Sequence, residues 1–150
     1  MGTPDKPTTG FLIWRLSTKW RADVDRALAP LGLTHAQFSV LAALAGLSRQ
    51  DRRPNQRELA GFTGLEPLYV SRLARALESA GLVERPVDPA DPRAVRLVLT
   101  ERGRTTAAEA VAIVHERHAA LTKAIGGPDG ERNRELRKTL LTLLNESEPT

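Results

Sequence analysis

The sequence of 150 residues contains no cysteine. Disulfide bonds, thiolate catalysis, thiol-based redox sensing and cysteine-ligated zinc are therefore excluded. The sequence also lacks an apolar run near the roughly 18 residues that a membrane-spanning helix needs, and residues 1–9 lack the hydrophobic core of a signal peptide. We therefore expect a soluble, cytoplasmic protein without membrane contact, whose residues 1–9 form a flexible leader.

Motifs for catalysis are missing as well. The chain shows no Ser-His-Asp arrangement, paired carboxylates or glycine-rich phosphate loop, so neither an enzyme nor a cofactor is expected. Only three histidines occur. Two of them, His115 and His118, lie three residues apart in a predicted helix, where together with Glu116 they have the spacing of metal ligands. We interpret these histidines as surface or interface residues and predict no metal site.

Arginine is what the chain has in excess. The formal net charge is +4 and the isoelectric point about 10.1, which favours an anionic partner. Residues 49–104 hold eleven arginines against eight acidic residues, and no lysine. Because the planar guanidinium group suits two-pronged contacts with guanine and phosphate, this segment is the candidate binding region.

The spacing of apolar residues predicts a mainly α chain with a small β-hairpin, an α+β fold. Pro30 ends the first predicted helix, and Thr34 begins the second, with Gln37 as its capping-box partner and Gly46 at its end. Asn55 caps a short third helix, and Thr100 should cap the helix that begins at residue 101. The first helix covers residues 10–29, later helices cover residues 67–80, 101–125 and 130–145, and the strands cover residues 82–86 and 94–99.

The helix over residues 67–80 is the candidate DNA reader. If Val70 and Leu77 are centred on its buried face, the opposite face is polar and basic, as a helix in the major groove requires. An ordinary solvated face is the alternative interpretation. The predicted DNA contacts on the outer face and its flanks, beside the polar Ser79, are Leu68, Tyr69, Ser71, Arg72 and Arg75.

The hairpin that follows carries Arg93 at its tip, and an arginine there can enter a narrow minor groove, where the negative potential is strongest. Asp91 lies two residues earlier and is expected to stabilise the tip by pairing with an arginine. Arg96 alternates with apolar neighbours, so we expect it to face solvent and to contact DNA. Asn55 and Gln56 begin a helix whose amides favour a phosphate; as a cap alone, Asn55 needs no such role.

Taken in order, these segments resemble the MarR family of winged-helix transcriptional regulators. The resemblance covers residues 11–145 and implies a winged helix-turn-helix region over residues 34–104. Residues 70–81 would be its recognition helix, and the hairpin with Asp91 and Arg93 its wing. Pro92 departs from the family pattern, which often has a basic residue there. The matching motifs are Leu33-Thr34-x-x-Gln37-Phe38-x-Val40-Leu41, Glu58-Leu59-Ala60, Val70-Ser71-Arg72-Leu73, Leu77-Glu78-x-x-Gly81-Leu82-Val83, Asp91-Pro92-Arg93 and Leu99-Thr100-x-x-Gly103.

The last predicted helix carries leucines at positions 140, 141, 143 and 144, which spread more widely than the apolar stripe on an outer helix of a monomer. This width predicts a subunit interface. By the resemblance, residues 10–33 and 105–145 are the dimerisation helices of a homodimer. Because the family commonly binds small aromatic or phenolic effectors, Trp14 and Trp20 are candidate ligand contacts, although core packing is the preferred interpretation.

We therefore predict a homodimeric, ligand-responsive repressor that binds double-stranded operator DNA at a pseudo-palindromic site. One alternative is a winged-helix module that binds other proteins and no specific DNA sequence. A small metabolic enzyme that uses a cleft of the dimer is the weaker alternative, because no catalytic motif supports it.

Overall fold

The computed structural model describes residues 6–91, 93 and 95–146, which form six α-helices and one two-stranded antiparallel sheet. This agrees with the predicted mainly α fold. The chain divides into two compact units, residues 1–113 and 114–150. The elements are α1 (Thr9–Leu28), η1 (Ala29–Leu31), α2 (His35–Ser48), α3 (Gln56–Thr63), α4 (Pro67–Ser79), β1 (Val83–Glu84), β2 (Val98–Leu99), α5 (Glu101–Thr122), η2 (Lys123–Ile125) and α6 (Glu131–Glu146).

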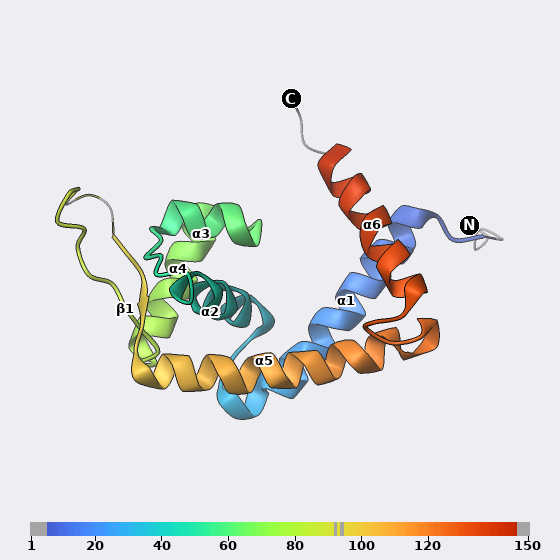
Figure 1. Ribbon diagram of the computed structural model, residues 1–150, viewed down its shortest axis with the longest axis horizontal. Helices are drawn as coiled ribbons and strands as arrows, with labels where there is room; N and C mark the ends of the chain where they lie inside the picture. Colours follow the sequence, from blue (N-terminus) through green and yellow to red (C-terminus); the bar gives the residue numbers. More distant parts are fainter. Residues whose placement is uncertain (1–5, 92, 94, 147–150) are drawn as a thin grey trace, which may run out of the picture. The chain divides into compact units, whose positions relative to one another are not determined.

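The core of the first unit lies among α2, α3 and α4, which contact one another pairwise, with the hairpin beside them (Figure 1). Each helix contributes leucine or valine side chains at helical spacing to one buried face. The largest completely buried side chains here include Val40, Leu41, Leu59, Val70 and Leu77. The three helices thus support one another and present the outer face of α4.

The ends of α2 show which local signals decide its length. The predicted capping box is confirmed: the Thr34 side chain accepts a hydrogen bond from the Gln37 amide, and the Gln37 side chain accepts one from the Thr34 amide. The predicted end at Gly46 is wrong, because α2 continues to Ser48. Leu47 is buried in the core, and its burial outweighs the modest cost of a glycine inside a helix.

The hairpin is shorter than predicted. Regular pairing joins only Val83 to Leu99 and Glu84 to Val98, although an isolated bridge between Val87 and Val95 continues the same register. Position 94 of the predicted second strand lies outside the described residues. The segment before α3 also pairs with the second strand of the hairpin. Asn55 forms a bridge with Arg96, and the Leu97 amide donates a hydrogen bond to the Pro54 carbonyl at 3.0 Å. The hairpin is therefore hydrogen-bonded to the start of α3 in addition to the pairing between its two strands.

Thr100 joins the hairpin to α5 and to the end of α4. Its hydroxyl accepts a hydrogen bond from the Gly103 amide at 2.9 Å, which confirms the predicted cap, and donates to the Gly81 carbonyl at 2.7 Å. Gly103 is buried, and its backbone approaches that of Leu82 so closely that no side chain fits between them. A glycine is needed at this position for close packing.

The amino-terminal helix leaves most of its apolar residues exposed. Of its apolar residues, only Val24 and Leu28 are buried, whereas Leu12 is 52% and Trp14 63% exposed. The preferred interpretation of Trp14 as a core residue is therefore wrong within a single chain, and Trp20 is half-buried.

In the second unit, α6 is likewise exposed along its apolar face. Leu140 is 39%, Leu141 55% and Leu144 66% exposed. Its start is fixed by Asn133, whose side-chain amide donates to the Pro128 carbonyl at 2.8 Å. A helix with such a face needs a partner surface to be buried against.

No single helix in the described part of the chain is both long and apolar enough to cross a membrane. The segments Thr9–Leu31 and His35–Ser48 reach that length and composition only as a pair bent by 73°.

Candidate nucleic-acid interface

The outer face of α4 is polar, basic and exposed, as the helical wheel predicted. Pro67 occupies the first turn, where its missing N–H leaves no bond unmade. Val70, Leu73, Ala74 and Leu77 are buried. Ser71 lies half-buried at the edge. The other predicted contacts, Leu68, Tyr69, Arg72 and Arg75, are exposed, as are Ala76, Glu78 and Ser79. The face has the composition of a groove-reading helix, with two guanidinium groups and one exposed leucine, Leu68.

The start of α3 and the tip of the wing border one cavity. Asn55 acts as the expected cap, since its Oδ1 accepts a hydrogen bond from the Glu58 amide at 2.8 Å. The cavity of about 350 Å³ is lined by Asn55, Gln56, Arg57, Asp91, Arg93 and Val95. It brings three of the predicted DNA contacts together. Sequence reasoning missed Arg57, although its position in the first turn after the cap was a usable signal.

Gln56, which lines this cavity, has a side-chain amide that is not fully hydrogen-bonded among the described residues. Among the residues that the structure describes, its Nε2 is buried and has no hydrogen-bond partner. A buried donor without an acceptor costs free energy. The start of α3, where Gln56 lies, is a helix N-terminus, and such a terminus favours an anion such as a phosphate.

Asp91 holds the wing tip through the backbone. Its Oδ1 accepts a hydrogen bond from the amide of Arg93 at 3.0 Å, and the Arg93 side chain is exposed. Asp91 was expected to pair with an arginine side chain. Among the described residues of the wing, Asp88 makes that pair instead. Pro92, where the chain departs from the family pattern, falls outside the described residues.

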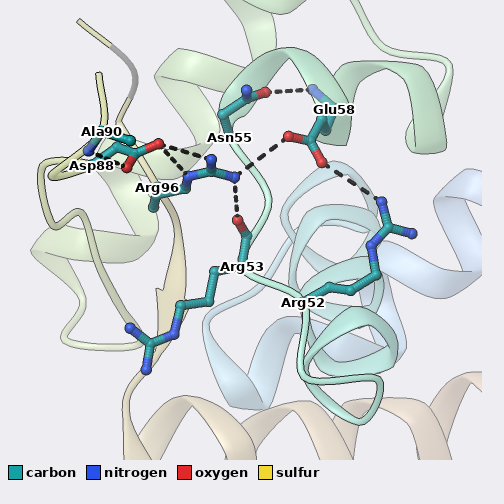
Figure 2. A network of polar contacts seen from close by, with 7 residues as sticks. All are labelled: Arg52, Arg53, Asn55, Glu58, Asp88, Ala90 and Arg96. Atoms are coloured by element: carbon teal, nitrogen blue, oxygen red, sulfur yellow. Dashed lines mark hydrogen bonds and ion pairs between the residues drawn. The ribbon is translucent and has the colours of Figure 1, made fainter. Parts of the chain in front are cut away.

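Arg96 is predicted to face solvent, but its guanidinium group is engaged within the protein and only partly exposed. Its Nε and Nη2 both donate to Asp88 Oδ2, at 3.0 and 2.8 Å, and its Nη1 donates to the Arg53 carbonyl at 2.7 Å (Figure 2). The side chain is only 34% exposed. The prediction failed because alternation along one strand ignores the diagonal neighbour across the hairpin. Arg96 pairs with Pro86 through its amide, which places Asp88 two residues further along the opposite strand, within reach of a long side chain.

The environment of Asp88 favours its charged form. The amide of Ala90 and then the guanidinium of Arg96 hydrogen-bond to its carboxylate and hold the pKa of Asp88 below its usual value. The same bond raises the pKa of Arg96 above its usual value. Both groups are therefore ionised at neutral pH, and the pair is a charge-assisted hydrogen bond.

Comparisons with known proteins agree with this geometry. The MarR family model matches residues 33–95. The HTH-type transcriptional repressor Rv2887 of Mycobacterium tuberculosis is 33% identical over 140 residues, which are 93% of this chain and 96% of that protein. The chain belongs to the MarR family. An uncharacterised HTH-type transcriptional regulator of Bacillus subtilis, YdcH, is 36% identical over 107 residues, 71% of this chain and 73% of that protein.

Solved structures of MarR proteins share the fold over nearly the whole chain. CouR from Rhodococcus jostii RHA1 bound to p-coumaroyl-CoA has a TM-score of 0.75 at 35% identity, covering 94% of this chain and 92% of that one. CouR has also been solved on a 23-mer DNA duplex. The Mycobacterium tuberculosis protein has been solved with DNA and with salicylic acid; in the DNA complex the TM-score is 0.69 at 31% identity, covering 92% of this chain and 98% of that one.

The remaining candidate residues stay predictions. Trp14 and Trp20 lie on α1, in the first unit, and nothing in the described structure identifies a ligand beside them. In the described part of the chain, no group of three or more histidine, aspartate or glutamate side chains is placed to bind a metal ion.

Proposed function

We propose that this MarR protein is a homodimeric transcriptional repressor that binds operator DNA through α4 and the wing. The observation that carries the proposal is the exposed basic face of α4 in the same compact unit as the cavity between α3 and the wing tip. Arg72 and Arg75 are suited to base edges or phosphates in the major groove, and Arg93 to the minor groove. The relatives solved with DNA support this assignment.

The phosphate backbone would be held at the start of α3. Asn55, Gln56 and Arg57 border the cavity beside Arg93, and the start of a helix favours an anion. Contacts of this kind release counterions from DNA, so binding would weaken steeply as the salt concentration rises.

A second copy of the chain would cover the exposed apolar residues of α1 and α6. Leucines that are 39–66% exposed on α6 are unusual for a protein that stays monomeric. Two α4 helices held by a dimer would occupy successive major grooves of a pseudo-palindromic site. Such a regulator would act in the cytoplasm, where its DNA is.

Control by a small aromatic or phenolic effector completes the proposal. Its support is that relatives have been solved with salicylic acid and with p-coumaroyl-CoA. An effector would release DNA by favouring dimers whose two α4 helices are wrongly spaced for successive grooves.

The experiment is a binding measurement with a fluorescently labelled duplex that the wild-type protein has enriched from a random-sequence pool. Arg72→Ala and Arg93→Ala should each weaken binding by about tenfold or more, the loss expected when one charge-assisted contact with DNA disappears. Lys138→Ala on α6 removes one positive charge outside α4 and the wing, on the side of the helix opposite its leucines, and should bind as wild type does. Wild-type affinity in both test variants would reject α4 and the wing as the DNA reader and favour a protein-binding module.

A further inference from the structure

Arg96 connects three segments of the first unit that are far apart in sequence. Its guanidinium group contacts Asp88 in the wing, the carbonyl of Arg53 in the loop after α2, and Glu58 in α3, whose Oε1 lies 3.5 Å from Nη1. Figure 2 shows the guanidinium between these partners. We call this set of contacts, made by Arg96 with Asp88, Glu58 and the Arg53 carbonyl, the wing tie.

The donors of Arg96 are directed into the protein. Nε and Nη2 converge on one oxygen of Asp88, and Nη1 is directed at the Arg53 carbonyl, with Glu58 beside it. A guanidinium group has five N–H donors in a fixed plane. All three of its nitrogens are thus engaged in contacts within the protein, so Arg96 cannot also bind a DNA phosphate in a two-pronged contact without breaking the wing tie.

Each partner of Arg96 is itself connected to the candidate DNA interface. Asp88 Oδ1 accepts from the Ala90 amide at 2.9 Å, and the Asp88 carbonyl accepts from the Asp91 amide, so Asp88 shapes the loop that leads to the wing tip. Glu58 is the residue whose amide Asn55 caps, and its second oxygen lies 3.6 Å from Nη2 of Arg52. The wing tie therefore links the approach to the tip with the first turn of α3.

Backbone bonds reinforce the same connection. The Arg96 amide donates to the Pro86 carbonyl, and the amide of Leu97 donates to Pro54, next to Asn55. The wing is a two-stranded ribbon with only two regular pairs, and isolated ribbons of this kind are marginally stable in water. Its orientation relative to α3 thus depends on contacts outside the ribbon, and the wing tie supplies the charged ones.

We propose that Arg96 is a positioning residue that acts through the wing tie and does not contact DNA. It holds the wing tip against the start of α3, so that Arg93 and the first turn of α3 meet the duplex together. Asp88 and Glu58 are its partners in this role. The proposal rests on the proposed function of DNA binding, and it reassigns Arg96 from a DNA contact to an internal support.

Two conservative substitutions separate positioning from direct attraction to DNA. Asp88→Asn removes a negative charge near the duplex and keeps the side-chain shape, so simple electrostatics predicts tighter binding. Arg96→Lys keeps the positive charge but lacks the planar fork that reaches all three partners. The wing tie predicts that both variants bind the selected duplex about tenfold more weakly than wild type, the effect expected when one charge-assisted hydrogen bond is lost.

A double-mutant cycle measures the dependence of one residue on the other. The pair Asp88→Ala and Arg96→Ala should together weaken DNA binding no more than Arg96→Ala alone, since either change breaks the same tie. Far-UV circular dichroism of every variant monitors whether the helices remain folded. If an alanine variant unfolds, Asp88→Asn and Arg96→Lys still decide the question, because they alter the fewest atoms.

The outcomes distinguish this proposal from the function on which it rests. Wild-type affinity in either Asp88→Asn or Arg96→Lys, or an additive cycle, would overturn the wing tie while Arg72→Ala still lost DNA binding. Loss of affinity in the Asp88 and Arg96 variants together with unchanged binding by Arg72→Ala and Arg93→Ala would instead reject the α4 and wing assignment.

Discussion

Replacing Gly103 by alanine tests the tightest junction in the fold. An added Cβ would overlap the Leu82 carbonyl oxygen and lie 2.9 Å from its carbonyl carbon, whereas carbon atoms pack best at about 3.5–4.0 Å. The backbone of either α5 or the segment before β1 must therefore move. That movement strains the hydrogen bond from the Thr100 amide to the Leu82 carbonyl, which is 3.1 Å long.

The loss in free energy of unfolding for Gly103→Ala is the sum of three contributions. Overpacking costs about 1–3 kcal/mol, loss of the Thr100 bond costs about 1 kcal/mol, and alanine gains about 1 kcal/mol over glycine in a helix. The net loss for Gly103→Ala is about 2 kcal/mol, which corresponds to a fall in Tm of about 4–8 °C for a chain of this size. Thermal unfolding followed by far-UV circular dichroism measures it.

Gly46→Ala is the matched control. Gly46 also lies inside a helix, but a Cβ there meets nothing within 4 Å. The helix-propensity gain of about 1 kcal/mol should then act alone and raise the Tm by about 2–4 °C. An unchanged or higher Tm in Gly103→Ala would refute the close-packing argument, because the same substitution would then behave alike at both sites.

Two further predictions concern pH and assembly. Burial, the largest effect, lowers the pKa of His35; Asp25 raises it and Arg21 lowers it. Because the pKa is lowered overall, His35 binds fewer protons in the folded chain than in the unfolded chain. The free energy of unfolding therefore falls as the pH drops below about 6.5. The Tm of wild type should decrease between about pH 7.5 and about pH 5.5 more than that of His35→Gln, and equal decreases would exclude this histidine as the cause. Leu141→Arg places a charge on the exposed apolar face of α6. In sedimentation velocity, wild type should be a dimer and the variant a monomer. If the variant stays dimeric, the interface lies elsewhere.

Local signals in the sequence predicted most of the helices. Thr34 with Gln37, Asn55 and Thr100 act as caps because the hydrogen bonds join residues only three apart. The buried face of α4 follows from the spacing of Val70 and Leu77 in the same way. Such features depend on the chain within one or two helical turns, and so a single sequence contains the information for them.

Features that depend on distant partners were missed. The position of Arg96 depends on Asp88 across the hairpin and on Glu58 and Arg53 in other segments. Alternation along one strand cannot specify such a neighbour. The usable signal was that Asp88 and Arg96, which carry opposite charges, lie diagonally across the hairpin.

The burial of α1 was missed for a related reason. The period of its apolar residues indicates that a face is covered, but not whether this chain or another copy covers it. For Trp14, which is exposed in the single chain, the sequence alone did not distinguish a core residue from an interface residue. The leucines of α6 differ, because the width of their stripe did predict an exposed face.

The central claim is that two copies of α4 and the wing read operator DNA, and selection from a random-sequence pool of duplexes tests it most directly. The account predicts enrichment of a two-fold-symmetric site whose half-site centres lie about one helical turn, roughly 10 bp, apart. Wild-type protein should enrich it, and Arg72→Ala should not. Failure of the wild-type protein to enrich any sequence, or enrichment of the same site by Arg72→Ala, would contradict the claim.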